Sequence, residues 1–137
     1  MSEITYRTGN DLDLDQMIEL YVASTLGERR PVDDRARMGV MLKQANLVIT
    51  AWDGDLLVGI SRSLTDFSFA TYLADLAVRQ SHQRQGIGTE LIRLTQKEGG
   101  SARIVLLSAP KAVEYYPHVG LTQHHSAWML GPDERVR

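Results

Sequence analysis

Two glycines one residue apart stand where a strand is expected to give way to a helix. The chain runs from an apolar stretch through the polar loop 79–85 to Gly86 and Gly88. The first N–H groups of a helix have no partners within it, and the helix dipole adds partial positive charge there. Glycines let a ligand come close to the backbone. The pattern therefore favours binding of a phosphate group at the start of a helix.

Two common phosphate-binding motifs do not match this segment. A P-loop has a lysine between its last glycine and a Ser or Thr, and Gly88-Thr89 has none. A dinucleotide-binding fingerprint needs a third glycine near position 91, where Leu91 stands, and an early β-α-β unit. Positive charge is local, since Arg79, Arg84 and Arg93 surround the glycines although the net charge is −2. We expect a small anionic ligand that is held locally.

The spacing of apolar residues predicts the elements that position this segment. Helices are expected over 14–22 with Asp13 as N-cap, from Asp33 or Asp34 to about Asn46, from Ile87 to Gly99, and over Ala112–Tyr116 with Pro117 as its stop. Strands are expected over 4–7, 47–52, 56–64, 67–78, 104–107 and 121–130. Asp53-Gly54 indicates a hairpin turn whose central residues favour positive φ. This order predicts an α+β fold (an α/β/α sandwich), with a mixed, mostly antiparallel sheet and helices on both faces.

Length and composition restrict the class of protein. A chain of 137 residues fits a single domain over 1–137. Cysteine is absent, so disulfides, thiolate nucleophiles and cysteine zinc sites are excluded. The N-terminus does not resemble a signal peptide, and no apolar run is long enough to span a bilayer. We therefore expect a cytoplasmic protein, and the charge balance predicts no nucleic-acid or membrane partner.

Two ordered motifs resemble those of the GNAT superfamily of N-acetyltransferases. The sequence Gln83-Arg84-Gln85-Gly86-Ile87-Gly88 is similar to the family's acyl-CoA signature between the fourth strand and the third helix. The sequence Leu73–Val78 resembles the fourth strand itself. Residues 112–121 resemble a later family segment, A-x-x-Phe-Tyr-x-x-x-Gly-Phe. The resemblance covers residues 47–130, and the first 46 residues follow the family in the order of their helices.

The resemblance implies acetyl-CoA as cosubstrate. Backbone N–H groups from Gln85 to Thr89 would hold the pyrophosphate, and Arg84 would add charge beside them. Main-chain groups of Leu76, Ala77 and Val78 would pair with the pantetheine arm, which enters where the fourth and fifth strands separate. Nearby N–H groups could polarise the thioester carbonyl. The implied cofactor-binding residues are Leu76, Ala77, Val78, Gln83, Arg84, Gln85, Gly86, Ile87, Gly88 and Thr89.

The resemblance also implies a general acid. Tyr116 aligns with the family tyrosine that protonates the leaving thiolate, whereas Tyr115 stands at a core position. The amine must lose a proton before it attacks, and Asp75 is the best-placed carboxylate, with histidines 118, 124 and 125 as alternatives through water. Adjacent His124 and His125 would point to opposite faces of a strand, so we expect no metal site.

Several readings of the function stay open. A small-molecule amine is the expected acceptor, because the loop 27–31 between the first helices is short and charged. The sequence lacks a nucleophile for an acyl-enzyme, so we expect direct transfer in a ternary complex. Phe67, Phe69 and Tyr72 could line the acceptor pocket or pack in a hairpin. The alternatives are acetylation of a peptide or protein amine, and a non-catalytic acyl-CoA-binding regulatory domain. A homodimer is common among small relatives and is also open.

Overall fold

The computed structural model describes residues 3–137. The chain divides into two compact units, one ending at Leu107 and the other comprising Ser108–Arg137, and each is described by itself. The single domain over 1–137 stays a prediction. Within the described residues, no helix is both long and apolar enough to cross a bilayer.

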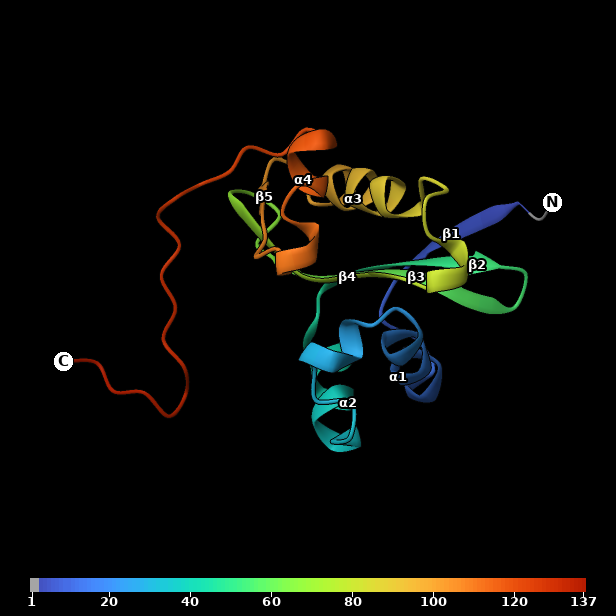
Figure 1. Cartoon of the computed structure of the whole chain (residues 1–137), viewed down its shortest axis with the longest axis horizontal. Coiled ribbons are helices and arrows are strands. Elements are labelled where there is room, and N and C mark those ends of the chain that lie inside the picture. The colour runs from blue at the N-terminus through green and yellow to red at the C-terminus, as the bar shows by residue number, and fades with distance from the viewer. Residues whose placement is uncertain (1–2) are drawn as a thin grey trace. The chain divides into compact units, whose positions relative to one another are not determined.

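The first unit is a sheet with helices on both faces. Within residues 3–107 the sheet has five strands in chain order: β1 (Ile4–Thr8), β2 (Leu47–Asp53), β3 (Leu56–Thr65), β4 (Ala70–Val78) and β5 (Arg103–Val105). Neighbouring strands are antiparallel except β4 and β5, which are parallel. Helices α1 (Leu14–Ala23) and α2 (Arg35–Gln44) lie on one face and α3 (Ile87–Glu98) on the other (Figure 1). The predicted α+β fold with a mixed, mostly antiparallel sheet is confirmed.

Local side-chain chemistry sets where these elements begin. Asp13 caps α1 by accepting a hydrogen bond from the N–H of Gln16 at 3.1 Å, and Asp34 caps α2 in the same way from Arg37. The hairpin after β2 is shifted by one residue from the prediction. Its two-residue turn is Gly54-Asp55, because Asp53 still pairs with Leu56, and of these two only Gly54 has a positive φ.

Strand β4 begins at Ala70, three residues later than its predicted start. The carboxylate of Asp66 accepts hydrogen bonds from the N–H groups of Ser68, Phe69 and Ala70, which folds 66–69 into a tight loop. These bonds compete with strand pairing. At the far end of α3, Gly99 is the C-cap and Gly100 has φ +68°, as the glycine pair predicts.

Helix α3 packs closely against the sheet at Gly59. A Cβ atom at Gly59 would stand 3.1 Å from both Ile87 Cγ2 and Leu91 Cδ1, so the absence of a side chain lets the first turns of α3 approach β3. Two turns further on, the hydroxyls of Ser61 and Thr95 share a buried hydrogen bond of 2.7 Å. The start of α3 is therefore fixed relative to the end of β4, which lies beside β3.

A second layer of packing lies on the opposite face. Buried side chains of α1, α2 and the sheet form one cluster there, and α3 covers a separate cluster on its own face. The first cluster contains Met17, Leu20, Tyr21, Met38, Leu42, Ala45, Val48, Trp52, Leu57, Ile60 and Ala77. One buried hydroxyl, that of Ser63 on β3, has no hydrogen-bond partner among the described residues.

The second unit is mostly irregular. After a 3₁₀ turn over Pro110–Ala112, the short helix α4 spans Tyr115–His118. Pro117 does not stop the helix as predicted but lies in its first turn. Proline is tolerated there because backbone N–H groups of the first turn make no hydrogen bond within the helix. The predicted strand over 121–130 is wrong, since the structure has no strand in this segment. A strand forms only where its backbone can pair with another strand. Within 121–130 the one hydrogen bond to a side chain is local, from the N–H of Ser126 to His124 Nδ1.

The close contact at Gly59 predicts a size-dependent loss of stability. Gly59→Val should lower the free energy of unfolding by about 1–3 kcal/mol, because the added carbons crowd Ile87 and Leu91. Gly59→Ala should cost less, since a single Cβ needs only a small shift of two side-chain ends. Urea unfolding measures both, and equal stability of all three proteins would contradict this account of how α3 is seated.

Candidate functional site

Strand β4 has an edge that β5 covers only at its beginning. The parallel pairing joins Ala70 with Arg103, Thr71 with Ile104 and Tyr72 with Val105, and it ends there. On its other side β4 stays paired with β3 as far as Val78. Within residues 3–107, the backbone groups of 73–78 that face the β5 side therefore have no strand partner. An extended ligand with amide groups could pair with this edge as an added strand.

The loop that follows β4 has an unusual backbone. Arg84 and Gly86 both adopt left-handed conformations, with φ +64° and +82°. Gly86 is the N-cap of α3 and offers no side chain as a cap, although its carbonyl accepts the first helical bond, from the N–H of Glu90 at 3.0 Å. A Cβ at Gly86 would meet no atom within 4 Å, so the positive φ and not space accounts for glycine here. Such a helix start can receive an anion.

Side chains of the loop attach it to the sheet. Gln83 donates from Nε2 to the carbonyl of Val78 at 3.0 Å, which closes the loop onto the last residue of β4. His82 Nε2 lies 2.9 Å from Asp53 Oδ2 on β2, and its Nδ1 lies 2.7 Å from the Ser81 hydroxyl. These bonds hold the left-handed segment beside the open edge of β4.

The three arginines around the glycines are not equivalent. Arg79 is engaged by Glu19 of α1, with Nη1 2.8 Å from Oε2, and it also donates to the carbonyl of Leu57. Arg93 is paired with Glu90 one turn earlier on α3. Arg84 makes no ion pair with any residue in 3–137. Of the predicted positive group, Arg84 is therefore the one whose charge is free for a ligand.

Asp75 lies at the centre of a buried polar cluster on the α1/α2 face. Its Oδ2 accepts hydrogen bonds from Tyr21 Oη and Arg62 Nε, and its Oδ1 accepts one from Arg30 Nε, each at 2.6 Å. Arg30 Nη2 also donates to the carbonyl of Ala74 at 3.0 Å, and Arg62 Nη1 donates to that of Met41. The side chain of Asp75 is fully buried. The cluster thus joins α1, the α1–α2 loop, β3 and β4.

These contacts also determine the protonation of Asp75. Burial by itself would raise the pKa of Asp75, but the charge and hydrogen bond of Arg62, with Tyr21 and Arg30, outweigh it and lower the pKa below its ordinary value. Burial and the nearby carboxylate raise the pKa of Tyr21 well above its usual value. A carboxylate with a lowered pKa and three donors is a weak base. The geometry therefore favours a positioning role for Asp75, and the base role stays a prediction.

Two of these three partners carry little signal in sequence. Tyr21 fits the apolar pattern of α1, and Arg30 belongs to a loop that reads only as charged. Arg62 is the residue that could have been found, because a single charged side chain stands within the run 56–64 that otherwise reads as a buried strand. A buried arginine requires an acid. The register then supplies it, since Arg62 and Asp75 are opposite each other on β3 and β4.

The aromatic residues near the start of β4 are exposed. Phe67 is in the left-handed conformation with φ +60° within the Asp66 loop, and Phe69 lies under the guanidinium of Arg103 at 4.9 Å from the ring centre. Tyr72 is 42% exposed. None of the three is packed in a core, and their role at an acceptor pocket stays a prediction.

The predicted general acid belongs to the second unit. Tyr116 is the second residue of α4, and its ring meets that of Tyr115 edge to face at 5.3 Å between centres. The carbonyl of Tyr116 accepts a hydrogen bond from the N–H of Leu121 at 2.9 Å. Burial, with a smaller effect of Tyr115, raises the pKa of Tyr116, so the phenol holds its proton at neutral pH.

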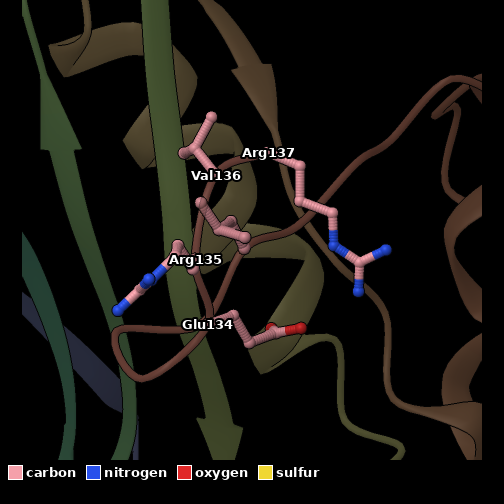
Figure 2. A pocket seen from close by; sticks show the side chains of 5 residues that line it. Glu134, Arg135, Val136 and Arg137 are labelled. Carbon is pink, nitrogen blue, oxygen red and sulfur yellow. The ribbon is translucent and has the colours of Figure 1, made fainter.

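A pocket of about 540 Å³ lies within the second unit. Leu130, Glu134, Arg135, Val136 and Arg137 line it (Figure 2). Glu134 also accepts a hydrogen bond from the N–H of Gly131 at 2.7 Å. The lining contains none of the residues that the sequence predicts for a site. Among residues 3–137, no three His, Asp or Glu side chains gather as a metal site would require.

Comparisons with known proteins point in one direction. A family model described as an acetyltransferase (GNAT) domain matches residues 25–128. A GNAT-family acetyltransferase from Streptococcus pneumoniae TIGR4 is similar in structure, with a TM-score of 0.73, 26% identity, and coverage of 93% of this chain and 98% of that one. A comparison with curated proteins gave no match.

Two further solved structures share the fold at lower identity. The aminoglycoside N-acetyltransferase AAC(6')-Iy in complex with CoA has a TM-score of 0.74 and 16% identity, with 97% of each chain covered. An aminoglycoside acetyltransferase from an uncultured soil metagenomic sample has a TM-score of 0.69 and 22% identity, and 93% of this chain and 94% of that one are covered.

The lowered pKa of Asp75 predicts how stability depends on pH. Asp75→Asn should lower the free energy of unfolding by about 3–5 kcal/mol at neutral pH, because it leaves two arginines without their carboxylate. The contribution of the ionised group is complete above its unfolded pKa of about 3.9 and is lost as pH falls through the lower folded value.

Urea unfolding of both proteins between neutral pH and acid tests this. The difference between wild type and Asp75→Asn should be constant down to about pH 4 and shrink below it. Asp15→Asn is the matched control, because Asp15 forms an exposed ion pair with Arg35 and its loss should change stability little. A difference that stays constant below the unfolded pKa would contradict the assignment.

Proposed function

The chain belongs to the GNAT acetyltransferase family, and from this premise we propose that it transfers an acetyl group from acetyl-CoA to a primary amine of a small molecule. The transfer takes place by direct attack with both substrates bound. The observation that supports this most is the open edge of β4 together with the start of α3 that follows it in the chain. The N-cap residue of α3, Gly86, has no side chain to cap the helix. Those two features suit the two halves of one extended, phosphorylated cosubstrate.

The residues present fit that cosubstrate. N–H groups from Gln85 to Thr89 surround the start of α3 and bind the pyrophosphate, with Arg84 beside them as the unpaired cation. The segment of Leu76, Ala77 and Val78 borders the uncovered edge of β4, and its main-chain groups on that side bind the pantetheine amides. Gln83 holds the loop in place through Val78. In this proposal the pyrophosphate and the amide arm are recognised mainly by backbone.

The proton transfers follow from the chemistry of amine acetylation. Acetyl-CoA, when bound, supplies the acetyl group and accepts a proton on its sulfur as the carbon–sulfur bond breaks and a carbon–nitrogen bond forms. An alkyl ammonium has a pKa near 10, so it gives up one proton to water or a base before it attacks. The nitrogen loses a second proton as the amide forms, and this proton replaces the one that the general acid gives to the sulfur. Tyr116 donates the proton to the sulfur, since its phenol is protonated at neutral pH.

Asp75 acts in this proposal by position. Its three hydrogen bonds fix the middle of β4, one residue before the segment 76–78 that binds the amide arm. The proposal therefore assigns proton removal from the amine to solvent or to the histidines at 118, 124 and 125 acting through water. The absence of cysteine suits a reducing compartment, and we propose a cytoplasmic setting on that ground.

The first test concerns the free cation at the loop. Arg84→Gln should weaken binding of acetyl-CoA about 3- to 10-fold by removing one charge-assisted contact to phosphate. Arg93→Gln is the matched control, because Arg93 is engaged by Glu90, and it should bind acetyl-CoA like the wild type. Titration calorimetry measures both, and equal losses in the two variants would contradict the role of Arg84.

The second test concerns the general acid. Tyr116→Phe should lower kcat about 100-fold or more while the dissociation constant of acetyl-CoA stays unchanged, because the ring is kept and the proton donor is lost. Tyr115→Phe is the neighbouring control and should change kcat little. Thiol release from acetyl-CoA measures turnover, and unchanged kcat in Tyr116→Phe removes this residue from the mechanism.

A further inference from the structure

The polar cluster around Asp75 does not balance in charge. Two guanidinium groups, from Arg30 and Arg62, contact the single carboxylate, so the cluster carries one positive charge in excess. The side chains of Arg62 and Arg30 are only 10% and 23% exposed. A charge withdrawn from water in this way is costly unless an anion or another polar group compensates it.

One end of this cluster still has donors to offer. Arg62 uses Nε for Asp75 and Nη1 for the carbonyl of Met41, and its guanidinium also contacts the Tyr21 hydroxyl. Within residues 3–137, Nη2 has no hydrogen bond of good geometry. Ser63 Oγ is the one side-chain atom among the described residues that is both sealed from solvent and unpartnered, so Arg62 Nη2 is not completely sealed from solvent. A guanidinium nitrogen with free N–H groups, on a side chain that is nine-tenths buried, is a preorganised contact for an anion.

The position of the cluster connects it to the proposed acetyl-transfer site. Asp75 directly precedes residues 76–78, the segment proposed to bind the amide arm near the thioester. Ala77 and Val78 lie two and three residues further along β4, which is about 7–10 Å at the rise of a strand. Arg30 comes from the loop between α1 and α2, and it reaches the same strand at Ala74 and Asp75.

We propose that the acceptor is an amine that also carries a carboxylate, and that the excess guanidinium charge of Arg30 and Arg62 binds this carboxylate. The inference rests on the proposed acetyl transfer and specifies its acceptor class. The separation along β4 places the amine and the carboxylate several bonds apart, as in an ω-amino acid. A polycationic amine is disfavoured at the same place, because its second ammonium would meet the uncompensated positive charge.

Matched acceptors of equal length test the charge requirement. For each chain length from three to six carbons, the ω-amino acid, the n-alkylamine and the terminal diamine are compared by thiol release from acetyl-CoA. We expect kcat/KM of the amino acid to exceed that of the alkylamine about 10- to 100-fold, which is the effect of a charge-assisted hydrogen bond. The diamine should be the poorest acceptor, and added salt should reduce the preference.

Variants of the exposed member of the pair separate binding from folding. Arg30→Gln should raise KM for the amino acid about tenfold more than it raises KM for the alkylamine, with Arg30→Lys intermediate. A purely structural role would reduce turnover of both acceptors alike. Arg35→Gln removes a positive charge from an exposed ion pair on α2 and should leave the preference intact. If Arg30→Gln does not fold, the preference and salt dependence of the wild type decide the question.

The outcomes distinguish this inference from the proposed function. A protein that shows no binding of acetyl-CoA by calorimetry overturns both. A protein that binds acetyl-CoA but acetylates the alkylamine or the diamine as well as the amino acid overturns the carboxylate inference alone. The carboxylate inference alone is also overturned if acetyl-CoA binds but no ω-amino acid of the series is acetylated. A selective loss of the amino acid in Arg30→Gln supports it.

Discussion

The contact between α3 and Gly59 is the constraint on which the arrangement of the candidate site depends. A helix start can bind an anion only if it is presented at a fixed place, and here β3 presents it. The missing side chain at Gly59 lets Ile87 and Leu91 approach β3, and the Ser61–Thr95 bond fixes the helix two turns later. Because Gly59 is also the register partner of Val78, the same point holds the end of β4 and the beginning of α3.

On the opposite face of the sheet, a charged cluster adds to the packing of the apolar side chains. Asp75 draws together a helix, a loop and two strands through three short hydrogen bonds, and no apolar contact could impose the same directions. Thus β4 has two different neighbours. On the α3 face, the small size of Gly59 on the neighbouring strand β3 sets how closely the helix approaches. On the α1/α2 face, the carboxylate of Asp75 on β4 binds two guanidinium groups. Both adjustments meet within the few residues that precede the glycine pair.

Much of this could be predicted from the sequence, and the reasons for the remainder are physical. Local signals identify the helices and strands, because each depends only on residues close by in the sequence. These signals are the N-cap Asp13, the C-terminal pair Gly99-Gly100 and the spacing of apolar residues. The displaced start of β4 depends on Asp66 binding three successive N–H groups, which competes with an equally plausible strand pattern. The strand expected over 121–130 required a partner strand that no local pattern encodes.

In the candidate site, Arg79 and Arg93 are lost from the positive group because they pair with Glu19, which is distant in sequence, and with Glu90, one helical turn away. The sequence indicated that Asp75 is an important residue. Its lowered pKa depends on Arg62 and Arg30, whose positions beside it are known only from the fold.

Arg84 combines a charge that a ligand could use with a backbone conformation that side chains with a Cβ rarely adopt. Glycine at this position would relieve the backbone and remove the charge, whereas arginine keeps the charge and accepts the strain. Resistance to heat and affinity for an anion are thus opposed at one residue. Libraries of this protein selected only for thermal tolerance would be expected to drift away from arginine at position 84, and under the proposed role of Arg84 they would lose cosubstrate affinity without any change in the core.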